Sequence, residues 1–166
     1  LREGATPTGT MLGVDLTAIA QRLERLALGR GRHLELRVDE EIVARGHEER
    51  LERIIGHMVQ NAFDATDPGG RVWLVLGRSG GQALVEVGDT GRGMTEEFVR
   101  ERLFKPFQST KQAGMGIGAF ESFQYVQELG GRIVVDSKLG AGTKIQVLLP
   151  LFDVRKTSDL HAMEKA

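Results

Sequence analysis

The sequence predicts an α+β fold, a two-layer α/β sandwich in which three helices cover one face of a mixed, mostly antiparallel sheet. Two observations support this fold class. Helical periodicity recurs in three separate segments, and pairs of short strand-like runs joined by glycine turns lie between and after them. The expected helices span 48–65, 95–102 and 117–129.

The longest helix is expected from Glu48 to Ala65, because its apolar residues recur at spacings of three and four. An Asp-Pro-Gly-Gly run at 67–70 ends it. Thr95 opens the second helix, and two glutamates follow in its first turn, where the helix dipole favours negative charge. Two glycines at 130 and 131 end the third helix.

Strand-like runs surround these helices. The runs 33–38 and 41–44 are interpreted as a plausible hairpin. Two further pairs are expected around glycine-containing turns, one from 72–76 and 83–87 and the other from 132–135 and 144–149. The connection 103–113 is polar and irregular, and a connection of that length often has a function.

Length and composition indicate one soluble globular core. The 166 residues include 40% hydrophobic residues. We expect a flexible lead-in and a short linker helix in 1–30, the main domain in 31–152 and a disordered charged tail in 153–166. The linker helix begins after Asp15 and ends near Gly29.

The same numbers exclude several functions. A net charge of -1 gives no support to nucleic-acid binding. The absence of cysteine excludes disulfides and thiolate metal sites. The sequence has no apolar run of about 20 residues that would span a bilayer and no signal peptide, so direct membrane contact is not expected. The first residue is Leu1 rather than methionine, which suggests an excised piece whose membrane anchor, if any, lies upstream.

Three polar residues share one stripe of the main helix: His57, Asn61 and Asp64, at i, i+4 and i+7. We interpret the Asn61 amide oxygen as a ligand for a hard cation held mainly by phosphate oxygens, since magnesium prefers oxygen ligands and keeps few from the protein. The alternative is a solvated helix face.

Asp89 follows the expected strand 83–87, and its parity places it on the same face as the apolar residues of that strand. An inward carboxylate must accept hydrogen bonds, which an adenine amino group can donate. Gly91 and Gly93 would let the backbone pass close to a flat base. The alternative is an ordinary turn, for which this composition is also typical.

Gly114, Gly116 and Gly118 open the third helix directly after the long polar connection. Free N–H groups and the dipole at a helix N-terminus form an anion site, and glycines let phosphates approach the backbone. The segment matches neither the Rossmann fingerprint, since no buried strand precedes it, nor a P-loop, since no Gly-Lys-Ser/Thr follows.

Taken in order, five motifs resemble the N, G1, F, G2 and terminal Gly-Thr boxes of the Bergerat-fold ATPases and kinases. This family includes ATP-binding domains of gyrase, heat-shock chaperones, mismatch-repair proteins and sensor histidine kinases. Within it the sequence is most similar to sensor histidine kinases, closest to the PrsK-type. The resemblance covers roughly 33–150, and its motifs are His57-Met-Val-Gln-Asn61-Ala-Phe-Asp-Ala65, Asp89-Thr-Gly-Arg-Gly93-Met94, Leu103-Phe-Lys-Pro-Phe107, Gly114-Met-Gly-Ile-Gly118 and Gly140-Ala-Gly-Thr143.

The resemblance implies roles for these residues. Asn61 would hold magnesium against the triphosphate of ATP, and Asp89 would recognise adenine. Thr143 would lie beneath the base, and the connection 103–113 would be an ATP lid with Lys111 near a phosphate oxygen, unless Lys111 is simply solvated. The other implied nucleotide contacts are the base-pocket residues Gly91, Gly93 and Met94, the lid residues Phe104 and Phe107, and the phosphate-loop residues Gly114, Met115, Gly116, Ile117 and Gly118.

Position 57 separates transfer from hydrolysis. Hydrolysing relatives carry a glutamate there as the base for attacking water, whereas this chain has His57, which favours phosphoryl transfer. His57 is therefore a candidate catalytic residue, with a surface histidine of no chemical role as the alternative. Asp64 points the other way, because an aspartate at its position is common in the hydrolysing relatives; it would bind a magnesium-bound water.

The resemblance therefore implies the catalytic domain of a two-component sensor histidine kinase, which donates the γ-phosphoryl of Mg-ATP to a histidine on a separate dimerisation domain. The implied partners are that domain and a response regulator, in a homodimeric protein whose kinase domain is cytoplasmic. None of the four histidines, His33, His47, His57 and His161, has the sequence context of the phosphoacceptor. The alternatives are a self-contained ATPase or anti-sigma-type serine kinase, and a degenerate module that only binds nucleotide.

Overall fold

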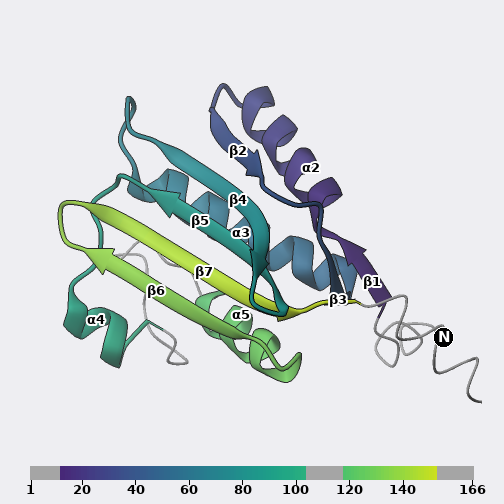
Figure 1. Ribbon diagram of the computed structural model, residues 1–166. Coiled ribbons are helices and arrows are strands. Elements are labelled where there is room, and N and C mark those ends of the chain that lie inside the picture. Colours follow the sequence, from purple (N-terminus) through teal and green to yellow (C-terminus); the bar gives the residue numbers. More distant parts are fainter. Residues whose placement is uncertain (1–11, 104–117, 153–166) are drawn as a thin grey trace, which may run out of the picture.

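The computed structural model of the chain describes residues 12–103 and 118–152. This part of the chain contains four helices and seven strands. Their arrangement is drawn in Figure 1. In chain order they are β1 (Leu12–Asp15), α2 (Leu16–Gly29), β2 (Leu34–Val38), β3 (Val43–Gly46), α3 (Glu48–Ala65), β4 (Val72–Ser79), β5 (Gln82–Asp89), α4 (Glu96–Glu101), α5 (Gly118–Glu128), β6 (Arg132–Lys138) and β7 (Gly142–Pro150).

The main sheet has five strands in the order β2-β4-β5-β7-β6. β2 runs parallel to β4, and the other three pairings are antiparallel. The predicted mixed, mostly antiparallel sheet is thus confirmed, together with the strand pairs β4–β5 and β6–β7. One pair of this register matters for the site: Asp89 at the end of β5 lies opposite Thr143 near the start of β7.

The hairpin expected from 33–38 and 41–44 is wrong. β2 lies in the five-stranded sheet beside β4, whereas β3 pairs with β1 in a separate two-stranded sheet. The residues between β2 and β3 connect two different sheets. Among them, the Ile42 carbonyl accepts a hydrogen bond from Leu16 N–H at 3.0 Å. Alternation of apolar residues identifies a strand but not its partner. Leu12 and Gly13, expected in the flexible lead-in, belong to β1.

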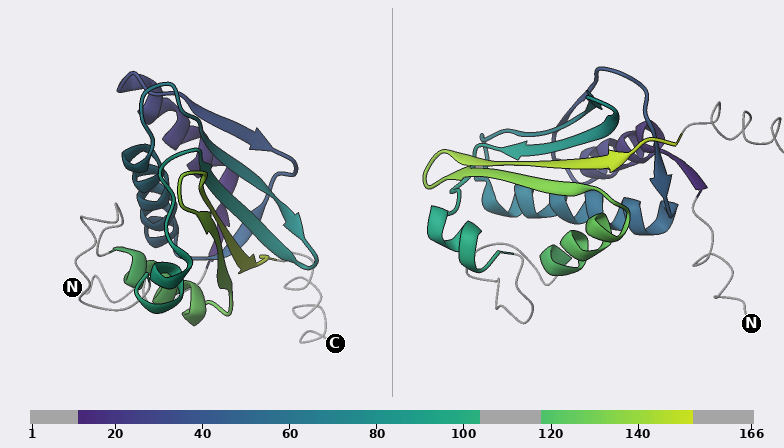
Figure 2. Two further views of the ribbon diagram at one scale, coloured as in Figure 1. Left: turned by 90° about the vertical axis from the view of Figure 1, so that its left-hand side faces the viewer. Right: turned by 60° about the horizontal axis from the view of Figure 1, so that its bottom comes forward.

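All four helices lie on one face of the main sheet, as the left view of Figure 2 shows. Asp15 caps α2 by accepting from Ala18 N–H at 3.2 Å, and the helix places Leu16, Ile19 and Leu23 in the same core as the sheet. The sequence predicts three helices on the sheet, but the structure has a fourth. This fourth helix is α2, which was predicted as a linker helix and covers the β2 end of the sheet. The predicted division of the chain at residue 30 stays a prediction.

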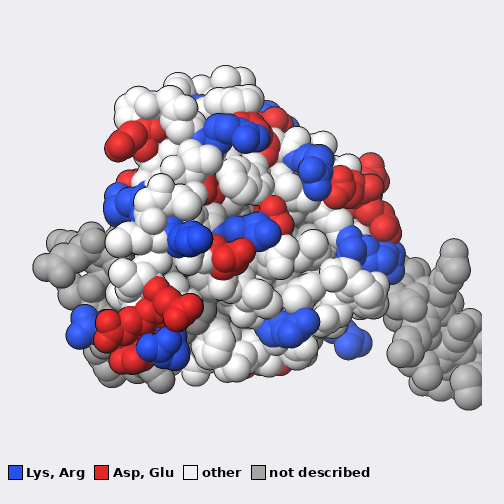
Figure 3. Space-filling view, turned by 60° about the vertical axis from the view of Figure 1, so that its left-hand side comes forward, with Lys and Arg blue, Asp and Glu red and all other residues white. Residues whose placement is uncertain are grey.

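On the opposite face of the sheet, Trp73 contacts polar side chains of the neighbouring strands. Trp73 Nε1 donates to Glu86 at 2.9 Å, and Gln146 donates to the other oxygen of the same carboxylate at 2.9 Å. Positive and negative side chains are interspersed over the face of the molecule in Figure 3. None of the helices in the described residues is both long and apolar enough to cross a membrane.

Candidate nucleotide-binding site

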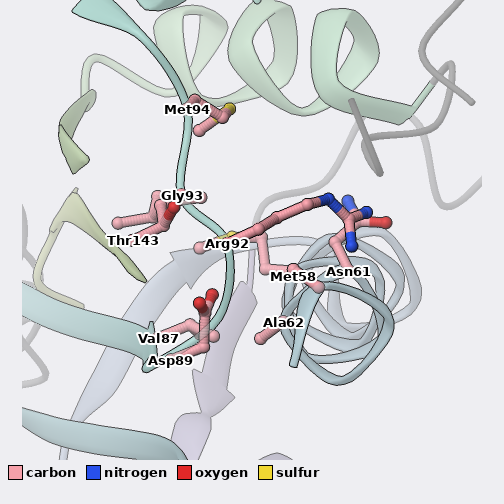
Figure 4. A pocket seen from close by; sticks show the side chains of 11 residues that line it. Met58, Asn61, Ala62, Val87, Asp89, Arg92, Gly93, Met94 and Thr143 are labelled. Carbon is pink, nitrogen blue, oxygen red and sulfur yellow. The ribbon is translucent and has the colours of Figure 1, made fainter. Parts of the chain in front are cut away.

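A pocket lies between the second half of α3 and the ends of β5 and β7 (Figure 4). Helical periodicity turns one side of α3 toward the sheet, so Met58 and Ala62 pack in the core while Asn61 stays at its margin, half-buried. The pocket is lined by Met58, Asn61, Ala62, Ala65, Val87, Asp89, Arg92, Gly93, Met94, Thr143 and Ile145.

Asp89 is the buried charged group of this pocket, with 6% of its surface exposed. Burial raises the pKa of its carboxyl above the ordinary value, although backbone N–H groups of Gly91 and Thr143 and the charge of Arg92 oppose that shift. The Gly91 N–H donates to Oδ1 at 2.8 Å. Asp89 is therefore held in one orientation as an acceptor, in a pocket whose floor is otherwise apolar.

The loop 90–94 is fixed by backbone contacts on both sides. Arg92 N–H donates to the Ala65 carbonyl at the end of α3 at 3.1 Å, and the Arg92 carbonyl accepts from Gly140 N–H at 2.6 Å. A Cβ on Gly91 would collide with the Ala65 carbonyl. Gly93 has a positive φ of 70°, and a Cβ there would collide with the Lys138 carbonyl. Close packing of backbone on backbone thus requires both glycines.

Ser137 is a site residue that the sequence did not indicate. Its Oγ accepts from Met94 N–H at 2.8 Å, donates to the Gly142 carbonyl at 3.2 Å and lies 2.7 Å from Thr143 Oγ1. With its own proton on Gly142, Ser137 accepts the Thr143 proton, so all these groups are satisfied together. Ser137 thereby ties the loop 90–94 to β7. A lone serine in a strand carries no pattern from which this contact can be predicted.

Arg92 is a second residue that sequence reasoning left without a role. Its side chain crosses the mouth of the pocket toward Asn61 in Figure 4, and one guanidinium nitrogen donates to the Asp64 carbonyl at 3.4 Å. It brings a positive charge to the Asn61 end of the pocket. The signal was present in the sequence, as the one cation between Gly91 and Gly93.

The predicted polar stripe of α3 divides between different surroundings. Asn61 lines the pocket, whereas Asp64 is exposed, accepts from Gln60 Nε2 at 2.9 Å and is not among the lining residues. His57 faces a separate hollow between α3 and α5. The structure therefore brings Asn61 together with Asp89, Gly93, Met94 and Thr143 and leaves His57 and Asp64 outside that group.

Part of the prediction lies outside the described residues. Gly118 is the first residue of α5. The lid and phosphate-loop predictions that fall on undescribed residues are those for Phe104, Phe107, Lys111, Gly114, Met115, Gly116 and Ile117.

Sheet order, helix placement and pocket together define a nucleotide-binding domain of one ATPase family. The chain belongs to the family described as "Histidine kinase-, DNA gyrase B-, and HSP90-like ATPase", whose model matches residues 46–153. Membership supports the use of ATP and confirms the Bergerat fold.

Two relatives of the chain are named as kinases. Sporulation kinase C of Bacillus subtilis is 32% identical over 106 residues, which are 64% of this chain and 24% of that protein. Sensor histidine kinase RppB of Synechocystis is 32% identical over 139 residues, which are 79% of this chain and 31% of that protein. The chain thus spans less than a third of the length of either protein.

Solved structures agree with this assignment. The catalytic domain of histidine kinase ThkA has a TM-score of 0.75 over 86% of this chain and 96% of that one, and at 22% identity it shows the shared fold. The mycobacterial sensor histidine kinase MprB has a TM-score of 0.66 at 28% identity, over 86% of this chain and 98% of that one. The predicted resemblance to sensor histidine kinase catalytic domains is confirmed, while the PrsK-type assignment stays a prediction.

Proposed function

We propose that the chain binds Mg-ATP and donates its γ-phosphoryl to a histidine on a separate dimerisation domain, as the catalytic domain of a two-component sensor histidine kinase. The observation that carries this proposal is the pairing, in one pocket, of a buried acceptor carboxylate, Asp89, with the amide of Asn61. The first group suits a base that donates hydrogen bonds, and the second suits the charged end of the nucleotide.

At the base end, Asp89 would accept a hydrogen bond from the adenine amino group, since Oδ1 already faces Gly91 N–H and the carboxyl is oriented before the ligand arrives. Apolar side chains of Val87, Met94 and Ile145 line the rest of this end and would pack on the faces of the base. Thr143 offers a hydroxyl beside Asp89, held through Ser137.

At the other end, the donor set fits magnesium. Asn61 supplies one neutral oxygen, which suits an ion that takes most of its ligands from phosphates and water, and Arg92 supplies a nearby positive charge. When bound, magnesium would neutralise the charge of the triphosphate. Asn61 would hold the ion in register with the pocket, while Arg92 would attract the phosphates.

The position of the carboxylates in the described residues supports transfer rather than hydrolysis. Asp89 is the single carboxylate among the described residues that line the pocket, and it lies at the base end. Asp64 is exposed and bonded to Gln60, and His57 faces another hollow. Water near the triphosphate would therefore find no carboxylate base among these residues.

The proposal extends to the surroundings of the domain. The acceptor histidine would lie on the dimerisation domain of a homodimeric protein, and the phosphoryl group would pass on to a response regulator. We place the domain in the cytoplasm, where ATP and a response regulator are both available. The sensor-kinase descriptions of the relatives support this arrangement.

The proposal is tested by phosphoryl transfer from γ-labelled ATP to the dimerisation domain supplied separately. Asn61→Ala should reduce labelled histidine about a hundredfold, because an electrostatic contact to the reacting phosphates is lost. Gln60→Ala is the matched control, since its amide is exposed one position away. Transfer that survives Asn61→Ala would refute the proposal. Steady phosphate release or labelled serine would favour an ATPase or serine kinase, and tight binding without turnover a regulatory module.

A further inference from the structure

A second hollow, of about 160 Å³, lies between α3 and α5. It shares no lining residue with the nucleotide pocket. We propose that this hollow docks an acidic side chain of the protein that accepts the phosphoryl group, an inference that rests on the proposed function. It is lined by Arg50, Arg53, Ile54, His57, Glu121, Ser122, Gln124 and Tyr125.

The position of the hollow is the first reason. His57 precedes Asn61 by four residues on α3, a rise of about 6 Å, and Ser122 follows Gly118 by four residues on α5. The hollow therefore lies beside the proposed triphosphate end of the pocket, about one helical turn away along α3. An acceptor whose nucleophile reaches the γ-phosphate must cover surface beside that end, and this hollow is part of that surface.

Charge is the second reason. Two arginines, Arg50 and Arg53, line the hollow against one carboxylate, Glu121. Arg50 is already engaged, with its guanidinium 3.8 Å from the centre of the Tyr125 ring and 3.9 Å from Glu128. Arg53 has no hydrogen bond or ion pair to another residue in the described part of the chain. Within those described residues its guanidinium is unpaired, and a guanidinium can form two parallel hydrogen bonds with a carboxylate from outside.

The shape of the site is the third reason. Tyr125 and Ser122 form a floor, with 2% and 6% of their surfaces exposed. The Tyr125 hydroxyl is fixed from below because it accepts from His47 N–H at 2.9 Å. The Tyr125 ring in turn holds Arg50 in place. A carboxylate entering the hollow would thus meet cations on a rigid base, which reduces the entropy lost on binding.

The test measures the KM for the separately supplied acceptor domain and the affinity for Mg-ATP in the same variants. Arg53→Glu should raise the acceptor KM roughly tenfold, the loss expected for one hydrogen-bonded charge pair, and leave ATP affinity unchanged. Arg53→Lys, which keeps the positive charge, should raise the acceptor KM less than Arg53→Glu does. Arg25→Glu is the matched control, an exposed arginine on α2 away from this groove, and should behave as wild type. Added salt should raise the wild-type KM more than that of Arg53→Glu.

An unchanged acceptor KM in Arg53→Glu would overturn the inference. So would a loss of ATP affinity in that variant, because the hollow would then serve the nucleotide. If the wild-type chain transfers no phosphoryl group at all, the proposed function fails first. The hollow is then read directly with a fluorescent hexaglutamate peptide: binding that Arg53→Glu abolishes supports an acidic ligand, and equal binding by both proteins refutes it.

Discussion

At the scale of single residues, Asp89 shows stability and binding in opposition. Its carboxyl is proposed to bind adenine, but burial raises its pKa, so its ionised form is disfavoured in the folded state. Below about pH 4 the side chain is protonated in both the folded and the unfolded chain. As the pH rises from there through the raised folded pKa, the folded state loses stability relative to a chain with a neutral residue at this position.

We therefore expect Asp89→Asn to unfold at a higher urea concentration than wild type at pH 7, with a smaller difference near pH 4. The Asn oxygen can still accept from Gly91, which directs its NH₂ group at the adenine amino group. ATP affinity should fall tenfold or more. Urea titrations at several pH values, with calorimetric ATP titrations, measure both effects. A variant that binds ATP normally would contradict the role of Asp89.

The sequence predicted Asp89, Asn61, Gly93 and Thr143 because each lies in an ordered motif, and the structure gathers all four at one pocket. It did not predict Ser137, whose contacts depend on how β6 is paired with β7. Helical spacing likewise placed His57 beside Asn61, but the packing of α5 against α3 decides which hollow it faces. Such contacts arise from tertiary structure and leave no local trace.

At the scale of elements, the turn after β5 is positioned by the end of α3. We expect Gly91→Ala to weaken ATP binding by tenfold or more and to destabilise the domain, because its Cβ would collide with the Ala65 carbonyl, and backbone cannot move aside as a flexible side chain can. Gly81→Ala is the matched control, since no atom lies within 4 Å of its Cβ. Thermal unfolding and ATP titration measure the difference, and equal behaviour of the two variants would contradict this account.

Elements were predictable where local pattern determines them. The bounds of α3 match the prediction, as its apolar periodicity and the following Pro-Gly turn are both local signals. β2 was recognised as a strand, but its neighbour β4 follows only after β3 and the whole of α3. A parallel pairing over that separation cannot be read from alternation. The sequence therefore favours the nearer run as the partner of β2, and this pairing is wrong.

At the scale of the whole molecule, α2 belongs to the ATP-binding core. Its sequence showed an amphipathic helix, but not which surface receives the apolar side. In the structure that side packs on β2 and β4, at the end of the sheet where β2 is the edge strand. Arg22 on α2 also contacts α3, because its guanidinium donates to the Glu52 carboxylate at 2.6 Å. Residues 16–29 thus cover the β2 end of the sheet, next to the part that α3 covers.

Ile19→Ala should therefore destabilise the entire domain. Ile19 is fully buried in the common core, so the substitution should lower the free energy of unfolding by about 2 to 5 kcal/mol. The control is Leu26→Ala on the same helix, where 55% of the side chain is exposed and a change within about 0.5 kcal/mol is expected. Urea unfolding followed by Trp73 fluorescence, which reports from β4, measures whether loss on α2 unfolds the sheet. If α2 were a separate linker, Ile19→Ala would leave the Trp73 transition where it is in wild type.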